Sequence, residues 1–213
     1  APPPSENHFW RRLAKIVKRD HNFRRFLLAR FLIGLGMMGM GFVTVAAVQR
    51  WHIPDDMAAL FTVALLFGQG AGNLLAGFVA DRHGHMLSLK IGILAAVIGF
   101  AVAWWIPGAN WYYVVFAFLG ISIGIQIVSG ILITMEFSTP EQRPTYMGVA
   151  NTVSGIGSSV APLVGGWLAL SFSYNSLFAV GMAVNVIGLL LLQWYVKEPR
   201  WQPVNNVVKE EVK

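Results

Sequence analysis

The chain has 213 residues, of which 55% are hydrophobic and only 12% are charged. Soluble domains contain about 45–50% apolar and about 25% charged residues, so this composition excludes a disordered chain, a collagen, a coiled coil and a basic DNA-binding domain. It also argues against a soluble globule, which could not bury so much apolar surface. Because the chain has no cysteine, a disulfide framework and a thiolate metal site are excluded as well.

The first 25 residues are predicted to hold the end of a linker and then an amphipathic basic helix. Residues 2–7, PPPSEN, have the composition of a linker. Between Phe9 and Val17 apolar residues recur at helical spacing, and Lys and Arg fill the remaining face. Such a helix lies on the anionic lipid of an inner leaflet, where each Lys or Arg contributes about 1 kcal/mol. The alternative is that these charges only determine the topology of the chain.

Six apolar segments follow, and each is long enough to cross a hydrocarbon core of about 30 Å, which requires about 20 residues. Residues 91–135 and 144–196 contain no Asp, Glu, Lys or Arg. Since both stretches are too long for one span, each must fold back, at residues 107–110 and 171–176. Six such segments in succession disfavour the alternative of core helices in a large soluble protein. We therefore predict an all-α polytopic membrane protein whose transmembrane part covers residues 26–196. The predicted spans are 26–49, 58–80, 87–106, 112–135, 145–171 and 175–196.

The distribution of Lys and Arg predicts the orientation of these spans. With six spans both termini lie on one side, and 15 of the 16 Lys and Arg residues fall on that side. Only Arg50 falls on the other side, where tryptophans also mark the ends of the spans. The positive-inside rule therefore predicts that both termini, with the tail of residues 197–213, lie in the cytoplasm. We expect an integral protein of a bacterial-type inner membrane.

Two loops on the predicted cytoplasmic side carry a family pattern. Residues 77–86, GFVADRHGHM, resemble the G-x-x-x-D-R-x-G-[RK]-[RK] loop of the major facilitator superfamily of transporters. Residues 136–148, EFSTPEQRPTYMG, resemble the loop with Glu, Pro and Arg that precedes the fifth or eleventh helix of the same family. The following segment, with residues 161–166, and the exit KEPR at residues 197–200 are also similar to that family.

The resemblance implies an architecture and a function. The superfamily has twelve helices in two six-helix halves, and this chain is similar to the C-terminal half, in which three helices and three inverted ones form a repeat. It implies alternating-access transport of a small organic solute by a secondary transporter, with an N-terminal six-helix half as partner in the same parent chain or a separate one. The expected partners are that half, membrane lipid and a small-molecule substrate; no nucleic acid and no cofactor are expected.

The resemblance also implies a conformational latch in the cytoplasmic loops. Opposite charges at a helix-end junction can hold one state of a transport cycle and release in another. This sequence departs from the family at His85 and Met86, where the pattern has two basic residues, so one charge is missing and the other depends on pH. The alternative is that the charges only fix topology. The predicted latch residues are Gly77, Asp81, Arg82, Gly84, His85, Glu136 and Arg143.

Polar and methionine side chains within the spans are candidates for the substrate cavity. By analogy with the family, the first helix of each triplet lines the cavity and the second lines the seam between the halves. The alternative for the polar residues is hydrogen bonding between helices, and for the small residues that recur every four positions in the second and fifth spans it is packing within this half. We expect Arg30 and Lys90 to reach from the first turns of their spans to the inner surface. The candidates for the substrate cavity are Met37, Met38, Gln69, Asn73, Gln126 and Asn151.

Two other functions remain to be weighed against transport. A transporter-like subunit that no longer transports and serves assembly of a larger complex is favoured by the short chain and the altered residues 85–86. A membrane enzyme is disfavoured, because no catalytic set, no metal-binding spacing and no phosphate-binding loop is present in the sequence. We therefore predict a transporter and not an enzyme.

Overall fold

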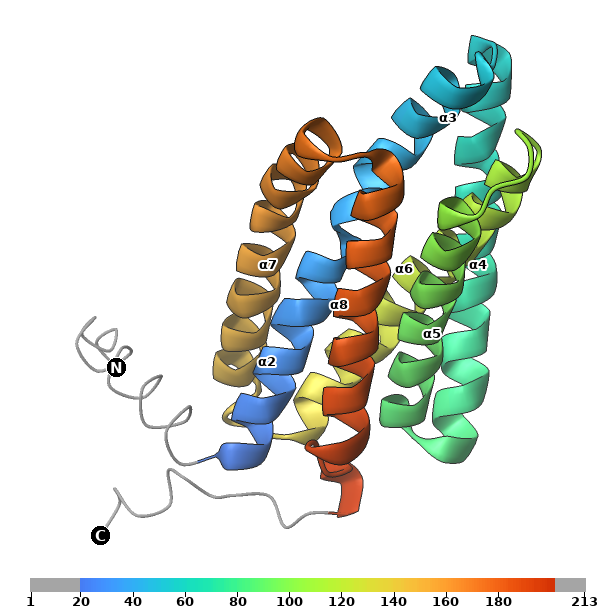
Figure 1. Cartoon of the computed structure of the whole chain (residues 1–213). Coiled ribbons are helices and arrows are strands. Elements are labelled where there is room, and N and C mark those ends of the chain that lie inside the picture. Colours follow the sequence, from blue (N-terminus) through green and yellow to red (C-terminus); the bar gives the residue numbers. More distant parts are fainter. Residues whose placement is uncertain (1–19, 202–213) are drawn as a thin grey trace, which may run out of the picture.

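The computed structural model describes residues 20–201, and this part of the chain is built from helices without any strand (Figure 1). Six of its elements are long and apolar enough to cross a membrane, counting α2, η1 and α3 as one, which confirms the predicted number of spans. The predicted linker and amphipathic helix lie outside the described residues, apart from residues 20–25, as does the tail beyond residue 201. The elements are α2 (His21–Gly36), η1 (Met37–Phe42), α3 (Val43–Trp51), α4 (Asp55–His83), α5 (His85–Trp104), α6 (Trp111–Glu136), α7 (Arg143–Ser171), α8 (Tyr174–Trp194) and η2 (Pro199–Trp201).

The first helix begins five residues earlier than hydropathy predicts. The side chain of Asp20 caps α2 by accepting a hydrogen bond from the backbone N–H of Phe23 at 2.8 Å. Asp20 is buried, and the hydroxyl of Tyr146 in α7 donates a second hydrogen bond to it at 3.3 Å. The rings of Phe23 and Tyr146 pack with their centroids 4.4 Å apart. The start of α2 is therefore fixed by contacts with α7.

The packing of the helices follows an inverted repeat of two triplets. The helix α2 packs against α7 and α8, the second and third helices of the other triplet. In the same way α6 packs against α4 and α5, and the two third helices, α5 and α8, pack against each other (Figure 1). Each of these contacts between the triplets therefore has a counterpart with the triplets exchanged. This pattern agrees with the six-helix half, built as a 3+3 repeat, that the resemblance implies.

Glycines bring α4 and α6 into backbone contact. A Cβ atom on Gly68 or Gly72 would lie 2.3 or 2.4 Å from a backbone oxygen of α6. From the other side, a Cβ on Gly120 or Gly124 would lie 2.2 or 2.3 Å from a backbone oxygen of α4. Small residues allow such close approach between membrane helices. The small residues of the second span therefore pack within this six-helix unit, as the packing alternative predicts.

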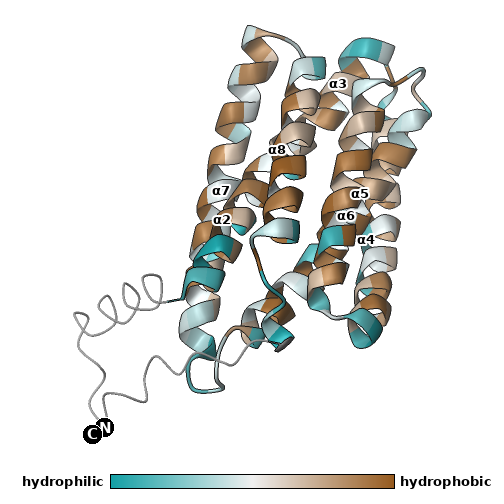
Figure 2. Cartoon of the chain, turned by 60° about the horizontal axis from the view of Figure 1, so that its bottom comes forward, coloured by the Kyte–Doolittle hydropathy of each residue, from teal (hydrophilic) through white to brown (hydrophobic). Residues whose placement is uncertain are grey.

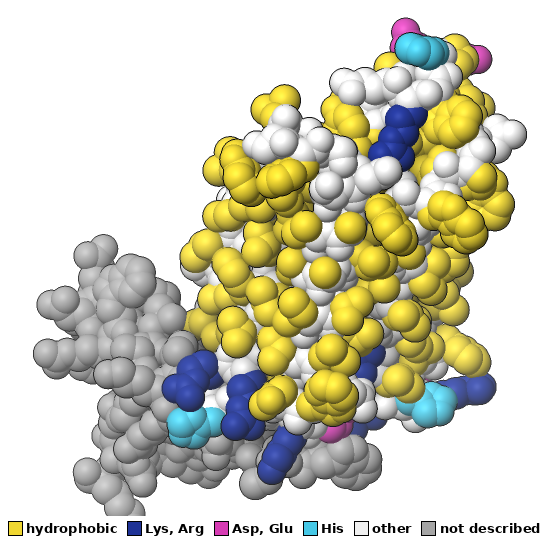
Figure 3. All heavy atoms as spheres, in the orientation of Figure 1, with side chains coloured by type: hydrophobic (Ala, Val, Ile, Leu, Met, Phe, Trp, Pro, Cys, Tyr) yellow, Lys and Arg dark blue, Asp and Glu magenta, His cyan; other side chains and the backbone are white. Residues whose placement is uncertain are grey.

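The surface of the bundle is suited to lipid. Figure 2 shows hydrophobic residues along most of the helix lengths and hydrophilic ones gathered toward the helix ends. Large apolar side chains are widely exposed, among them Leu74 at 78% and Leu170 at 91% of their surface. In Figure 3 such side chains cover the middle of the visible face, and Lys and Arg gather mainly at its lower end. With six apolar helices, the protein is an integral membrane protein.

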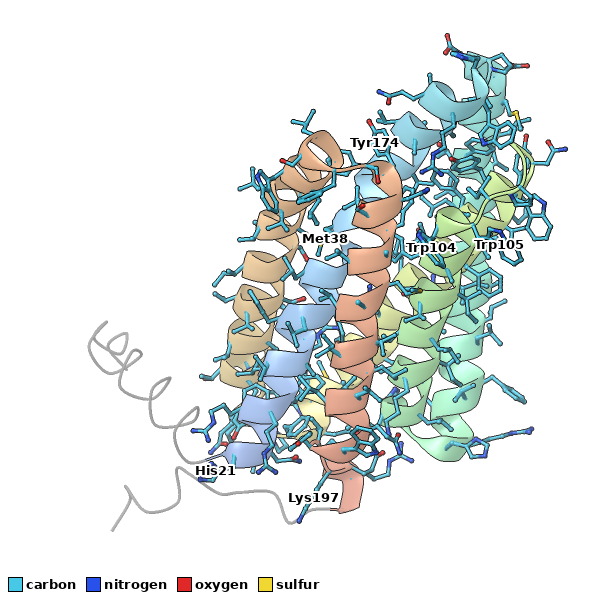
Figure 4. All side chains as sticks on the ribbon, viewed as in Figure 1. His21, Met38, Trp104, Trp105, Tyr174 and Lys197 are labelled. Carbon is cyan, nitrogen blue, oxygen red and sulfur yellow. The ribbon has the colours of Figure 1, made fainter. Side chains whose placement is uncertain are left out.

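The two ends of the bundle differ in chemistry. One end of the bundle, which we call the basic end, holds the start of α2, the turn at residues 83–85, the loop 137–142 and the end of α8. Figure 4 places His21 and Lys197 at this end, and Trp104, Trp105 and Tyr174 toward the opposite one. The side-chain amide of Asn22 donates to the carbonyl of Lys197 at 2.9 Å and accepts from its N–H at 2.8 Å. The first and last helices are thus tied together at the basic end.

Candidate functional site

A cleft of about 600 Å³ lies between the first span, α6 and α7. Its wall is mostly apolar, with methionines and Phe42 from the first span and isoleucines from α6. The polar groups in its lining are few, and they come from three different helices. A mostly apolar pocket with a few convergent polar groups is the usual form of a small-molecule site. The lining includes Arg30, Met37, Met38, Met40, Phe42, Ile123, Gln126, Ile127, Ser154 and Ser158.

The first span loses its α-helical form where it borders this cleft. The segment Met37–Phe42, sequence MMGMGF, is a 3₁₀ helix between α2 and α3. Its Gly39 lies against aromatic rings, since a Cβ there would be 2.8 Å from the ring of Phe100 and 3.0 Å from that of Phe178. A 3₁₀ stretch inside a longer helix often marks a functional hinge. Met38 lies about midway along the bundle in Figure 4, so the interruption falls within the membrane-spanning part.

Three of the six cavity candidates from the sequence line the cleft. Met37 and Met38 belong to the 3₁₀ segment, and Gln126 extends from α6. The side-chain nitrogen of Gln126 donates to the hydroxyl of Ser122 at 2.9 Å, which orients the amide. Ser158 of α7 faces Gly34 of α2, where a Cβ would lie 3.2 Å from its hydroxyl oxygen. The first helices of both triplets therefore contribute to this cleft.

The other three candidates lie outside the cleft lining. Gln69 and Asn73 sit on α4 beside α6, and a Cβ on Gly124 would lie 3.1 Å from the amide oxygen of Asn73. Asn73 and Asn151 are exposed, on α4 and α7 respectively. Their place in a cavity shared with further helices stays a prediction.

Sequence reasoning missed Arg30 as a residue of the site. The prediction places it in the first turn of its span, with the guanidinium reaching the surface. In the structure α2 begins at His21, so Arg30 is the tenth residue of the helix, and it lines the cleft. Its guanidinium lies against α6, where a Cβ on Gly130 would be 2.7 Å from Nη1. The sequence does contain a sign of this position, because apolar residues lie on both sides of Arg30: Phe26 and Leu27 precede it and an apolar run follows it.

A cluster of charges occupies the basic end, apart from the cleft. Arg200 pairs with Glu136, with 3.5 Å between Nη2 and Oε1. Burial raises the pKa of Glu198, the nearby carboxylate of Glu136 raises it further, and Lys90 and Arg200 oppose the shift. Gly84 adopts a φ of +93°, a conformation for which glycine is suited, and a Cβ there would lie 3.4 Å from Glu198 Oε1.

The structure gathers only part of the predicted latch into this cluster. Glu136 and Gly84 belong to it, whereas Asp81 and Arg82 are exposed at the end of α4. The guanidinium of Arg82 lies 4.2 Å from the centre of the Phe78 ring, a cation–π contact. The remaining members are placed as follows: Gly77 is half-buried in α4, His85 is half-buried at the start of α5 with Nδ1 unpartnered, and Arg143 is exposed as the first residue of α7.

The carboxylates of Asp20, Glu136 and Glu198 all lie toward the basic end, not in the cleft. Within residues 20–201 no three His, Asp or Glu side chains lie close enough together to hold a metal ion. The cleft therefore offers apolar surface, hydroxyl and amide groups and one guanidinium. These groups can bind and orient a small molecule, and none of them forms a nucleophile–base pair.

The chain is similar in sequence to curated transporters and to a multidrug resistance protein. The 4-hydroxybenzoate transporter PcaK of Acinetobacter baylyi is 26% identical over 169 residues, which are 79% of this chain and 37% of that protein. The facilitated glucose transporter member 8 of Bos taurus is 27% identical over 195 residues, 84% of this chain and 39% of the relative. Multidrug resistance protein 3 of Bacillus subtilis is 24% identical over 178 residues, 82% of this chain and 35% of the relative.

The chain thus spans about two fifths or less of the length of these three curated relatives. The sequence pattern of the Major Facilitator Superfamily matches residues 26–212. This range contains five complete spans and the first span without its first five residues. With this match and the six-helix repeat, the chain belongs to the Major Facilitator Superfamily.

Proposed function

We propose that this chain is the C-terminal half of a secondary transporter that moves a small organic solute across a bacterial-type inner membrane by alternating access. The observation that carries the proposal is the cleft, which is lined by the first helices of both triplets together with α7. The 3₁₀ segment Met37–Phe42 borders it and supplies a place where the first span can bend. Relatives named as transporters of 4-hydroxybenzoate and glucose support a small organic solute as the cargo.

An N-terminal six-helix half completes this transporter. Asn73 and Asn151 are exposed on α4 and α7, and lipid offers no hydrogen bonds to such amides. A second half packed on α4 and α7 would cover them and close the open side of the cleft. The length of the relatives supports such a partner, because the chain spans about two fifths of them. Both termini of this half face the cytoplasm in the proposal, because Lys and Arg concentrate at the basic end.

The cleft also weighs against the alternative of a transport-inactive assembly subunit. A purely structural unit has no need of a cavity of about 600 Å³ lined by Gln126 and Ser158. The departure at His85 and Met86 concerns the basic end and leaves the cleft intact. We therefore assign solute binding to the cleft. The altered residues 85 and 86 would change the balance between the inward- and outward-open states.

Cysteine chemistry tests the assignment, because this chain has no cysteine of its own. The complete carrier that contains this chain is reconstituted in liposomes, in a background whose other half is also free of cysteine, and uptake is measured for a panel that includes 4-hydroxybenzoate and glucose. Ser158→Cys places a thiol in the cleft, and Ser159→Cys places one on the neighbouring exposed position of α7, outside the lining.

A bulky thiol reagent should abolish uptake by the Ser158→Cys carrier and leave the Ser159→Cys carrier active. Transported solute should slow the labelling of Ser158→Cys, because solute and reagent compete for one space. Uptake that survives complete labelling at residue 158 would contradict the assignment of the cleft. Absence of uptake for every solute in the panel would favour the assembly subunit.

A further inference from the structure

The guanidinium of Arg30 is the one charged group among the residues that line the cleft. Arg30 lies nine residues beyond His21, the first residue of α2, which corresponds to about 14 Å along the helix axis. It faces Gly130, which lies six residues, about 9 Å, before the end of α6 at Glu136. Both measures place the guanidinium inside the span and not at its end.

No carboxylate lines the cleft beside this charge in the described part of the chain. The Nε atom of Arg30 is buried and has no hydrogen-bond partner within residues 20–201. Glu136 pairs with Arg200 at the basic end, away from the cleft. No Asp or Glu belongs to the cleft lining. Because an unpaired charge is costly inside a membrane, intramembrane cations usually mark a ligand or a partner charge.

Gly130 gives the guanidinium its place against α6. A Cβ on Gly130 would lie 2.7 Å from Nη1 and 3.3 Å from Nη2 of Arg30, so glycine is the residue that leaves this position free. Around it the cleft wall is apolar, with Met37, Ile127 and Ile131 in the lining. The site therefore combines one fixed positive charge with a wall that suits an apolar body.

We infer that the cleft binds a small organic anion with an apolar body, and that Arg30 pairs with its single negative group, a carboxylate. This inference rests on the proposed function, because it names the solute class of the same cleft. A guanidinium presents its N–H groups in a fork that fits a carboxylate in a bidentate geometry. Methionine and isoleucine side chains accept the apolar part, and Gln126 offers an amide for a further polar group.

Matched probes separate the charge of the solute from its shape. Binding of benzoate and of benzamide, and of hexanoate and hexanamide, is measured on the complete carrier in detergent by displacement and in liposomes by uptake. Each pair has the same body and differs in its charge. The variants are Arg30→Gln, which removes the charge, and Arg30→Lys, which keeps it. Arg24→Gln is the matched control, since Arg24 is an exposed arginine of the same helix outside the cleft.

The carrier should prefer the carboxylates to the amides, and Arg30→Gln should weaken carboxylate binding by about 10- to 100-fold, the usual effect of losing a hydrogen bond to a charged group. Amide binding should stay weak and unchanged, Arg30→Lys should retain much of the preference, and Arg24→Gln should behave as the parent. Gly130→Ala keeps the charge but displaces the guanidinium, so it should reduce carboxylate binding by a smaller factor.

Three results would overturn the inference, and they differ in what they leave standing. Uptake of the amides equal to that of the carboxylates, or of neutral solutes alone, would remove Arg30 from solute recognition while the transporter proposal stands. Loss of carrier stability in Arg30→Gln and Gly130→Ala with an unchanged carboxylate preference would assign the partner charge to the other half of the carrier. No uptake of any solute would remove the proposed function and the inference together.

Discussion

Replacing Gly72 by alanine tests the close contact between α4 and α6. Gly72 is buried in α4, and a Cβ there would lie 2.4 Å from the backbone oxygen of Ile121. Ordinary contacts begin at 3.4 Å, so α4 and α6 would have to separate by about 1 Å. The obstacle is backbone, which cannot rotate aside as a side chain could. Overpacking of this kind typically costs about 1–3 kcal/mol of unfolding free energy.

Gly70 provides the control within the same helix. It is exposed, and a Cβ there would meet nothing within 4 Å. Gly70→Ala should therefore be neutral or raise the unfolding free energy by up to about 1 kcal/mol, through helix propensity alone. Both variants of the complete carrier are unfolded by titration with dodecyl sulfate, and helix content is followed by circular dichroism. If Gly72→Ala is as stable as Gly70→Ala, the close approach of α4 and α6 is refuted.

Three further outcomes are expected. His52→Cys and Asn110→Cys should react with a membrane-impermeant thiol reagent only from the outer side of intact cells, and labelling from the cytoplasmic side alone would reverse the topology. Asp81→Asn should shift the balance of inward- and outward-open states by about 1–3 kcal/mol and slow transport at normal expression, and His85→Arg should act in the opposite direction. If Asp81→Asn leaves the transport rate and the cross-linking across the inner face unchanged, these charges serve topology alone. The pKa of Glu198 is raised in the folded protein above its ordinary value of 4.5, so the folded protein binds this proton more tightly than the unfolded chain does. The free energy of unfolding therefore falls as the pH rises from the pKa of the unfolded chain to that of the folded protein. Glu198→Gln should flatten that fall in a pH series of unfolding midpoints, and parallel curves for parent and variant would contradict it.

The spans were predictable because hydropathy reports burial in lipid directly. A run of about 20 apolar residues has one outcome in a membrane, whatever the neighbouring helices do. The exact start of a helix is a different matter, since it depends on capping. Asp20 caps α2 and accepts a hydrogen bond from Tyr146, and these two residues are 126 positions apart in the chain. No local pattern contains that contact.

The same limit explains which site residues the sequence revealed. Met37, Met38 and Gln126 were found because they lie in the first helices of the two triplets, which the resemblance assigns to the cavity. Arg30 was missed because the start of its helix was placed at residue 26, which turned a residue inside the span into one at its end. The cluster around Glu198 joins three separate stretches of the chain, residues 84–90, 136 and 198–200, and its members become neighbours only through the packing of the helices.

The first helix of each triplet packs closely against the second helix of the other triplet. The tenth residue of α6 is Gly120, and there the helix seals against α4, since a Cβ would lie 2.2 Å from the backbone oxygen of Leu65. The first helix of the other triplet, α2, approaches α7 in the same way, since a Cβ on Gly157 would lie 2.6 Å from the backbone oxygen of Phe31. The cleft lies between these two tightly packed helix pairs, where Arg30 borders it and lies against Gly130 of α6. Because Arg30 is the one charged side chain among the described residues that line the cleft, the proposed selection of an organic anion depends on this residue.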